Sequence, residues 1–280
     1  MREETLDLLC DPETSSPLIL QENEDGSQVL AGSNTTYPIR DGVADFLHQK
    51  PVTGINKRYQ MMYDHLSPFY NFVTRAAIRL MQADEDDVRR EYLCELEIKP
   101  GDRVLEVSVG TGTNLRLLPR DARYYGLDIS PGQLRQCKKL LKKIGLEAEL
   151  FLGAAESLPF YDNSFDVVFH MGGINFFGDP DLALREMYRV AKPGTKIVVV
   201  DETDRFTKKL AKIPIVQNFF KSDSDVNVPD PLVPQKAEDI QVKELFDGRL
   251  WYLSFRKAQT KVKPATVSTA LLKRRALQRV

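Results

Sequence analysis

The most informative stretch of the chain reads Val104-Leu105-Glu106-Val107-Ser108-Val109-Gly110-Thr111-Gly112-Thr113-Asn114, and Asp128 follows sixteen residues after Gly112. The apolar run predicts a buried strand, the glycines predict a tight turn into a helix, and Asp128 marks the end of a second strand. Because Gly110 and Gly112 carry no Cβ atom, the backbone can turn sharply there and approach a ligand. The N–H groups that begin the helix would suit an anionic group, and Asp128 can accept hydrogen bonds from both hydroxyls of a ribose. The unit therefore predicts a site for an adenosine-containing cofactor.

The spacing of the glycines separates two classes of cofactor. A dinucleotide-binding fingerprint needs a third glycine three residues after the second, and Leu115 occupies that position. The pattern instead resembles the first motif of class I S-adenosylmethionine-dependent methyltransferases, in which an acidic residue precedes a spaced Gly-x-Gly. Ser108 stands where that motif usually has its first glycine. Taken alone, the segment also fits a tight strand-to-helix turn that binds nothing.

The segments that follow alternate between strands and helices. Ser130 is a candidate N-cap for a helix with Pro131 in its first turn. The other expected elements are a strand at 148–152, a turn and strand within 162–170, a helix at 182–190, a strand at 195–200, and strands at 240–246 and 249–255 around an Asp247-Gly248 hairpin turn. This order predicts an α/β fold, a mostly parallel sheet with helices on both faces and an antiparallel edge.

Three further segments carry a resemblance to a known family. They are Ala154-Ala155-Glu156-Ser157-Leu158-Pro159-Phe160, Asp162-Asn163-Ser164-Phe165-Asp166 and Leu184-Arg185-Glu186-Met187-Tyr188-Arg189-Val190-Ala191-Lys192-Pro193-Gly194. With the first motif they make residues 100–204 resemble the ubiquinone/menaquinone-type methyltransferase family. The resemblance implies a Rossmann-like, seven-stranded class I methyltransferase domain. It also implies an enzyme of class EC 2.1.1 that uses S-adenosyl-L-methionine and releases S-adenosyl-L-homocysteine.

The same resemblance implies a set of cofactor-binding residues. They are Tyr59, Tyr70, Glu106, Gly110, Thr111, Gly112, Asn114, Asp128, Ile129, Gln133, Ala155, Glu156 and His170. In such a site Glu106 and the glycines surround the methionine moiety, and Asp128 with Ile129 holds ribose and adenine. Ala155 and Glu156 flank the adenine, a tyrosine from the 56–82 segment reaches the methionine carboxylate, and His170 lies near the sulfonium. For Glu156 the alternative is a cap on a local turn, and for His170 it is a buried side chain hydrogen-bonded to backbone.

Methyl transfer from a sulfonium depends mainly on the in-line alignment of nucleophile, methyl carbon and sulfur. A general base is needed only when the pKa of the acceptor is high. His170, His65 and Asp201 are the candidates for that role. No family motif supports any of them.

Composition limits the other possibilities. The chain has 280 residues, of which 42% are hydrophobic and 28% charged, and its net charge of −1 argues against nonspecific nucleic-acid binding by the whole surface. The three cysteines, Cys10, Cys94 and Cys137, form neither a disulfide framework nor a metal pattern. The acidic N-terminus lacks the basic and apolar regions typical of a signal peptide, and no run of eighteen apolar residues occurs, so we expect neither a signal peptide nor a membrane-spanning helix. We expect a cytoplasmic protein, with peripheral membrane contact as an option.

The chain before the core predicts two units. Residues 1–50 resemble a degenerate zinc ribbon, because Glu13 stands where a Cys-x-x-Cys partner of Cys10 would be, so we expect a small β-rich, metal-free extension. It either packs on the core or docks a substrate or partner. Residues 55–98 resemble the helical lid that covers the cofactor in this family, and the acidic run 84–87 predicts a solvated helix start.

Residues 99–258 complete the methyltransferase domain, and within it the apolar segment 205–239 predicts a cover over the acceptor site. The basic tail, 259–280, is either a solvated tail or a contact for anionic lipid or RNA. These features predict methyl transfer to a small, apolar or aromatic acceptor. Three alternatives stay open: a quinone C-methyltransferase at the membrane surface, an RNA or protein methyltransferase, and a non-catalytic cofactor-binding subunit. Nothing in the sequence defines the oligomeric state.

Overall fold

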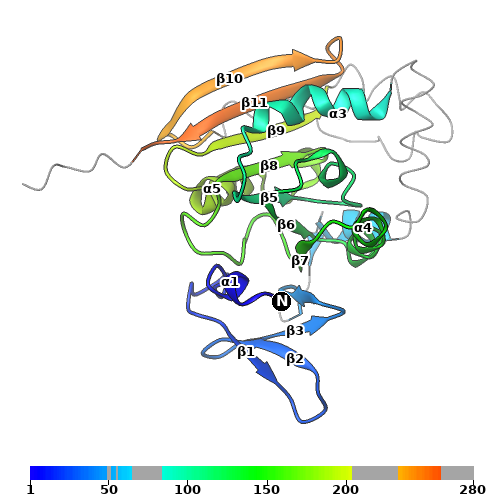
Figure 1. Ribbon diagram of the computed structural model, residues 1–280. Coiled ribbons are helices and arrows are strands. Elements are labelled where there is room, and N and C mark those ends of the chain that lie inside the picture. The colour runs from blue at the N-terminus through cyan, green and yellow to red at the C-terminus, as the bar shows by residue number, and fades with distance from the viewer. Residues whose placement is uncertain (49–51, 55, 65–83, 204–232, 260–280) are drawn as a thin grey trace, which may run out of the picture.

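One mixed sheet organises the computed structural model, which describes residues 1–48, 52–54, 56–64, 84–203 and 233–259 (Figure 1). In this part of the chain the strand order is β1-β2-β3-β4-β7-β6-β5-β8-β9-β11-β10. The strands of the core are β5 (Arg103–Val107), β6 (Arg123–Asp128), β7 (Ala148–Leu152), β8 (Val167–Met171), β9 (Lys196–Glu202), β10 (Ala237–Leu245) and β11 (Leu250–Lys257). Strands β5 to β9 are parallel, and β11 pairs antiparallel with β9 and β10. The predicted seven-stranded α/β sheet with an antiparallel edge is confirmed.

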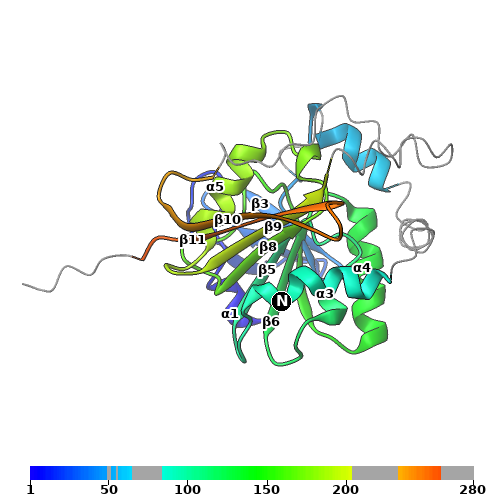
Figure 2. The same ribbon diagram turned by 90° about the horizontal axis from the view of Figure 1, so that it is seen from above.

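Two apolar layers cover the two faces of this sheet (Figure 2). On one face α5 (Pro180–Val190) buries Leu184 and Met187 against Leu105 of β5. On the other face α3 (Glu85–Leu93) and α4 (Pro131–Ile144) pack against the next residue of the strand, Val104. Successive side chains of a strand point to opposite faces, so the uninterrupted apolar run of β5 supplies both layers.

The helix predicted directly after the glycine turn is wrong. The chain forms only a short 3-10 turn there, η2 (Leu115–Leu117), and Leu118 is already extended with φ −84° and ψ 159°. Pro119 is the physical reason, because a proline disfavours the helical conformation of the residue before it. An anion site at the start of a helix, which the sequence suggested for this position, therefore has no helix to support it.

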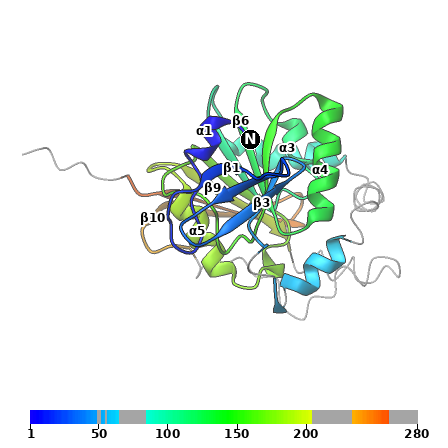
Figure 3. The same ribbon diagram turned by 90° about the horizontal axis from the view of Figure 1, so that it is seen from below.

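The N-terminal extension is β-rich, as predicted, but it belongs to the same sheet. Its elements are α1 (Glu3–Leu6), β1 (Ile19–Glu22), β2 (Gln28–Ala31), β3 (Thr36–Arg40) and β4 (Val43–Asp45). β4 pairs in parallel with β7, and Phe46 N donates to Leu152 O over 2.8 Å. The extension thus continues the sheet beyond β7, at the end of the molecule opposite β10 (Figures 1 and 3).

The extension also holds the segment that follows β7. Cys10 N donates to Pro159 O over 3.1 Å, and Tyr161 N donates to Leu8 O over 2.9 Å. Leu9 forms an antiparallel bridge with Phe160. The first residues of the chain therefore brace 159–161, a few residues beyond the predicted cofactor contacts Ala155 and Glu156.

The hairpin at the other end of the sheet has a longer loop than predicted. The last paired residues are Leu245 and Leu250, so four residues connect β10 to β11. Phe246, Asp247 and Gly248 all have positive φ, of 49°, 53° and 69°. No helix among the described residues is long and apolar enough to span a bilayer.

Candidate functional site at the carboxyl edge of the sheet

Four acidic or histidine side chains meet where parallel strands end. Glu106 lies near the end of β5, Asp128 at the end of β6, His170 near the end of β8 and Asp201 near the end of β9. β5 lies between β6 and β8, so strand order reverses at β5. Ligands of open α/β sheets bind outside the carboxyl ends of the strands at such a reversal. The sequence placed all four residues at strand ends, and the sheet brings those ends together.

The glycine turn after β5 has a left-handed backbone at three positions. Ser108, Gly110 and Gly112 have φ of 59°, 54° and 76°. Gly110 N donates to Asp128 Oδ2 over 2.8 Å, which ties the turn to the end of β6. A Cβ atom on Gly112 would lie 2.6 Å from Cys137 Sγ of α4, too close for any side chain. Gly112 is therefore required for close packing as well as for its dihedral angle.

Asp128 is buried and its two oxygens each accept one backbone hydrogen bond. Oδ2 accepts from Gly110, and Oδ1 accepts from Ser130 N over 2.9 Å. A carboxylate oxygen has a second lone pair, so acceptor capacity remains for hydroxyl groups. Burial raises the pKa of Asp128 to about 6, against the lowering effect of its backbone hydrogen bonds.

Glu106 is the least satisfied carboxylate of the site. Its Oε1 accepts from Asn114 Nδ2 over 2.6 Å, whereas its buried Oε2 has no partner in the described part of the chain. Burial raises the pKa of Glu106 to about 8, although the hydrogen bond from Asn114 and the charge of Arg89 lower it. A cation placed beside Oε2 would reverse this shift, since an opposite charge favours the ionised form.

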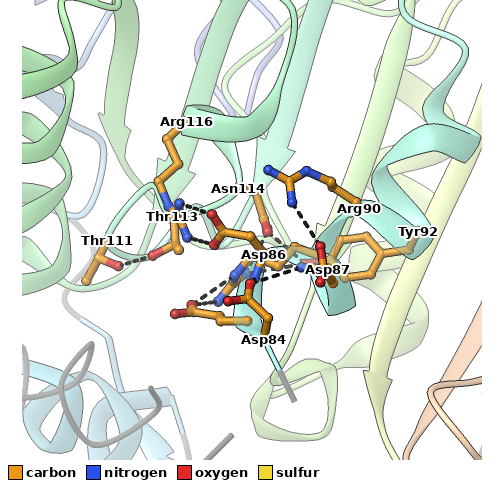
Figure 4. Close-up of polar contacts among 11 residues, drawn as sticks. Asp84, Asp86, Asp87, Arg90, Tyr92, Thr111, Thr113, Asn114 and Arg116 are labelled. Carbon is orange, nitrogen blue, oxygen red and sulfur yellow. Dashed lines mark hydrogen bonds and ion pairs between the residues drawn. The ribbon is translucent and has the colours of Figure 1, made fainter. Parts of the chain in front are cut away.

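A second layer of polar residues from α3 fixes Asn114 (Figure 4). Asn114 Oδ1 accepts from Arg89 Nη1 over 2.6 Å and from Tyr92 Oη over 2.7 Å. Glu85 in turn holds Arg89 through an ion pair of 2.8 Å. These contacts leave the amide group of Asn114 in one orientation, with its N–H toward Glu106. Arg89 and Tyr92 were not predicted as site residues, and the i,i+4 spacing of Glu85 and Arg89 was the one signal available for Arg89.

The acidic run 84–87 is only partly the solvated helix start that the sequence predicted. Asp84 caps α3 by accepting from the N–H of Asp86 over 2.8 Å, as expected of such a start. The side chain of Asp86, however, forms a two-pronged ion pair with Arg116 in η2 (Figure 4). In the same turn the buried hydroxyls of Thr111 and Thr113 lie 2.9 Å apart. The run therefore fastens α3 to the glycine turn.

A helical segment, residues 56–64, crosses the carboxyl ends of β6 and β7 (light blue in Figures 2 and 3). Gln60 Nε2 donates to Ile129 O over 2.8 Å, directly beside Asp128. Asp64 Oδ1 accepts from Ser130 Oγ over 2.6 Å and from Gly132 N over 2.8 Å, at the start of α4. The position and contacts of segment 56–64 are those of a cover over the carboxyl edge of the sheet.

Glu156 is engaged by the protein itself. Its Oε1 accepts from Asn56 Nδ2 over 2.9 Å and from the N–H of Gly178 over 2.8 Å, just before α5. These contacts favour the role of a cap that joins three segments, and a contact with adenine stays a prediction. Ala155 beside it is buried in the apolar core. Tyr59 stacks on Phe176 of η3 (Ile174–Phe176), with ring centroids 4.3 Å apart.

His170 and Asp201 are both buried, but their surroundings differ. The Nδ1 atom of His170 lies 2.9 Å from Val107 O and so carries the proton, while the buried Nε2 has no partner among the described residues. Burial lowers the pKa of His170, and the charge of Asp201 partly opposes this. Phe177 packs on the imidazole with centroids 4.9 Å apart. At pH 7 the ring is therefore a neutral acceptor at Nε2.

Asp201 serves the loop after β8. Its Oδ1 accepts from Gly173 N over 3.0 Å and from Glu202 N over 2.8 Å. Its Oδ2 accepts from Ile174 N over 2.9 Å and from Asn175 Nδ2 over 3.2 Å. Four donors occupy the carboxylate, so positioning the loop is the role that the geometry favours, and action as a base stays a prediction.

Residues 105–199 match the family described as a methyltransferase domain. A demethylmenaquinone methyltransferase from Thermotoga maritima is 32% identical over 216 residues, which cover 69% of this chain and 90% of that protein. The chain belongs to the S-adenosylmethionine-dependent methyltransferases. The predicted family, enzyme class and cofactor are confirmed.

One further protein resembles this methyltransferase in sequence, and another resembles it in fold. The ubiquinone/menaquinone biosynthesis C-methyltransferase UbiE of Stenotrophomonas maltophilia is 40% identical over 119 residues, 40% of this chain and about half, 47%, of that protein. The crystal structure of a putative methyltransferase from Bacillus halodurans aligns with a TM-score of 0.50 at 16% identity, covering 61% of this chain and 99% of that chain. The structural likeness shows the fold alone.

The methyltransferase site fits S-adenosylmethionine by the polar atoms that it leaves without protein partners. In the described part of the chain these buried atoms include Glu106 Oε2, Gln133 Oε1 and His170 Nε2. All three are acceptors at or beside the carboxyl edge, and buried acceptors normally have donors. The amino groups of the cofactor's methionine and adenine moieties are donors of the required kind. The predicted site residues Tyr70 and His65, and the segment 205–232, lie outside the described residues.

Proposed function

We propose that this methyltransferase places the methyl group on a ring carbon of a small, apolar hydroquinone. The observation that carries the proposal is the 32% identity with a demethylmenaquinone methyltransferase over 90% of that protein's length. The aromatic side chains Tyr59, Tyr63 and Phe176 support it, because they lie together at the carboxyl edge and would suit a flat acceptor.

Within this proposal each residue of the edge has a defined task. S-adenosylmethionine, when bound, supplies an electrophilic methyl group on a sulfonium. Glu106 would bind the ammonium of its methionine moiety through Oε2, and Asp128 would bind the hydroxyls of its ribose. Asn114, held by α3, keeps Glu106 in place. The protein thereby aligns the reactants, which is the main contribution that this reaction needs.

In this proposal His170 receives the proton of the acceptor. A hydroquinone is a weak acid, and its ring carbon becomes nucleophilic when a hydroxyl gives up its proton. His170 Nε2 carries a lone pair because Nδ1 donates to Val107 O. Burial lowers the pKa of His170, and the nearby charge of Asp201 offsets part of this lowering. As the hydroxyl proton passes to Nε2, the ring carbon would bond to the methyl carbon and the S–CH3 bond would break, with release of S-adenosylhomocysteine. Loss of the proton on the methylated ring carbon would then restore the aromatic ring.

A methyl-transfer assay tests the proposal. Purified protein is incubated with S-adenosylmethionine labelled in its methyl group and a short-chain prenyl naphthohydroquinone, with catechol and bulk RNA as parallel acceptors. We expect label only in the naphthohydroquinone, on a ring carbon by mass spectrometry and NMR, and at least about tenfold less with His170→Gln. Label in a catechol ether or in RNA would replace the proposed acceptor. Cofactor binding without turnover on any acceptor would favour a non-catalytic subunit.

A further inference from the structure

The exposed surface of α4 is a continuous basic face. The helix contains no acidic residue, and its five cationic side chains are all exposed: Arg135, Lys138, Lys139, Lys142 and Lys143. With 3.6 residues per turn they occupy an arc of about 140°, opposite the buried Leu134, Cys137 and Leu141. We refer to these five residues as the α4 basic face.

The arrangement of these charges does not stabilise the helix. Arg135 and Lys139, Lys138 and Lys142, and Lys139 and Lys143 are spaced i,i+4, where like charges repel. None of the five takes part in an ion pair with the residues that the structure describes; Lys138 Nζ donates only to the backbone oxygen of Asp41. Lys142 and Lys143 in the last turn favour the helix dipole, but the other three have no such benefit. An external anionic partner would relieve the repulsion.

The rest of the chain makes this face distinctive. The whole chain has 39 basic and 40 acidic residues, so its excess of acidic residues grows from one to six when the five are set aside. An anionic surface would therefore attract the molecule by α4 and repel much of the remainder. The arc carries no aromatic side chain, whereas proteins that bind single-stranded RNA usually stack bases on aromatic rings. A row of lysines without aromatic residues fits phospholipid headgroups better.

The position of α4 connects this face with the site. Its first turn binds the cover segment 56–64 through Asp64 and follows directly after Asp128 and Ile129. Figure 3 shows α4 along one flank of the molecule, with the cover segment beside its first turn. A surface that contacts α4 would therefore lie close to the entrance of the carboxyl edge.

We infer that the α4 basic face docks this methyltransferase onto an anionic phospholipid membrane. The contact goes beyond the proposed acceptor, because it requires only headgroup phosphates. It also has a use within that proposal, since prenylated quinols reside in membranes by virtue of their apolar tails.

Vesicle sedimentation tests the inference. The full chain is mixed with vesicles of phosphatidylcholine and phosphatidylglycerol in equal parts, and separately with phosphatidylcholine alone. We expect binding to the anionic vesicles only, weakening as salt is added. In the variant with all five residues of the α4 basic face changed to Gln, the partition coefficient should fall about a hundredfold.

A charge-matched variant supplies the control. It changes five exposed cations of other elements to Gln: Arg40, Arg90, Lys99, Arg185 and Lys236. We expect this variant to keep vesicle binding within about threefold. Both variants should bind S-adenosylhomocysteine like the parent chain, which shows that they fold.

Three results would overturn the inference. The first is equal loss of binding in the two variants, which means that net charge alone matters. The second is full binding by the α4 variant, which assigns the contact to the basic tail. The third is a parent chain that binds no vesicles but binds polyuridylate, with loss of this binding in the α4 variant, because the partner would then be RNA. None of these results depends on the methyl acceptor, so a failed methylation assay leaves this test intact.

Discussion

Asp11 lies in the N-terminal extension and Glu106 at the end of β5, and each residue is 1% exposed. Asp11 accepts four hydrogen bonds, from the side chains of Thr35 and Tyr37 and from the N–H groups of Glu13 and Thr14. Glu106 accepts one, from Asn114. Burial acts to raise the pKa of both groups, but the hydrogen bonds outweigh it at Asp11 and lower its pKa to about 2, whereas the pKa of Glu106 rises to about 8.

The difference separates a structural carboxylate from a binding one. Asp11 ties the turn at 11–16 to Thr35 and Tyr37, two strands away in the extension. In a zinc ribbon a metal would join such turns. Here a hydrogen-bonded carboxylate joins them and has no acceptor capacity to spare for a ligand. Glu106, in contrast, keeps one oxygen for a cation, and the protein stabilises its neutral form until that cation arrives.

Among the variants that compare the two carboxylates, Glu106→Gln should have the largest effect, and the effect should be on cofactor affinity. The substitution keeps the hydrogen bond from Asn114 but removes the charge that faces the cofactor's ammonium. We expect the Kd for S-adenosylhomocysteine to rise about 30- to 150-fold, because a hydrogen bond to a charged group contributes roughly 2 to 3 kcal/mol. Titration calorimetry measures the affinity. The free energy of unfolding should stay equal or increase slightly, since a buried ionisable group is lost. A variant that binds normally would show that Oε2 does not face the ligand.

Changing Asp11 to Asn should give the reverse result. The new NH2 group faces donors, so at least one buried hydrogen bond is lost, and we expect the free energy of unfolding to fall by about 2 kcal/mol. Urea unfolding checks this value. The affinity of the folded protein for S-adenosylhomocysteine should change less than about threefold, because Asp11 has no ligand-facing atom. Collapse of cofactor affinity without loss of stability would contradict the division between the two carboxylates.

The two carboxylates should also respond oppositely to pH. The folded pKa of Asp11, about 2, is below its ordinary 3.8, so its contribution to stability is present above pH 3.8 and is lost as pH falls through 2. The folded pKa of Glu106, about 8, is above its ordinary 4.5. Its burial therefore destabilises the unliganded protein increasingly as pH rises from 4.5 to 8.

Proton release measures the ionisation of Glu106 directly. With a pKa of about 8, Glu106 is about 90% protonated at pH 7, and binding of an ammonium should release about 0.9 proton per site. Calorimetry in two buffers with different ionisation enthalpies gives this number. Glu106→Gln should release close to none. Equal proton release by the parent chain and the variant would assign the titration to another group.

Residues near the strand ends could be predicted because single apolar runs define them. Each of Glu106, Asp128 and His170 lies within or closes such a run, and parallel pairing then collects them at one edge. Their partners could not be predicted. Arg89 and Asn114 are 25 residues apart, and Asn56 and Glu156 are 100 apart, so only the folded chain brings them together.

The strand pairing that connects the extension to the core could not be predicted for the same reason. β4 is only three residues long and pairs with β7 more than a hundred residues later. A strand so short has no readable alternation of apolar and polar residues. The missing helix after the glycine turn is different, because Pro119 is a visible signal against a helix there, and the prediction rested on the glycine turn alone.

We expect the smallest effects on stability from changes at two serines with a left-handed backbone, one in each region. Ser108 has φ 59° in the glycine turn, and Ser15 has φ 57° beside Asp11. A left-handed conformation costs a residue with a Cβ atom about 1 kcal/mol, and glycine avoids this but loses more chain entropy on folding. We expect Ser108→Gly and Ser15→Gly each to raise the free energy of unfolding by up to about 0.5 kcal/mol, measured by urea unfolding.

The affinity for S-adenosylhomocysteine tests whether these two variants differ. Ser108 precedes the turn that carries Gly110, so a change in backbone mobility there would reach the hydrogen bond to Asp128. Because both serines already have the dihedral angle that glycine prefers, affinity for S-adenosylhomocysteine should stay within about twofold in each variant. Weaker binding in Ser108→Gly alone would mean that the serine hydroxyl contacts the cofactor. Ser108 would then be a binding residue that merely occupies a glycine position, and the carboxyl edge would hold one more polar group reserved for its ligand.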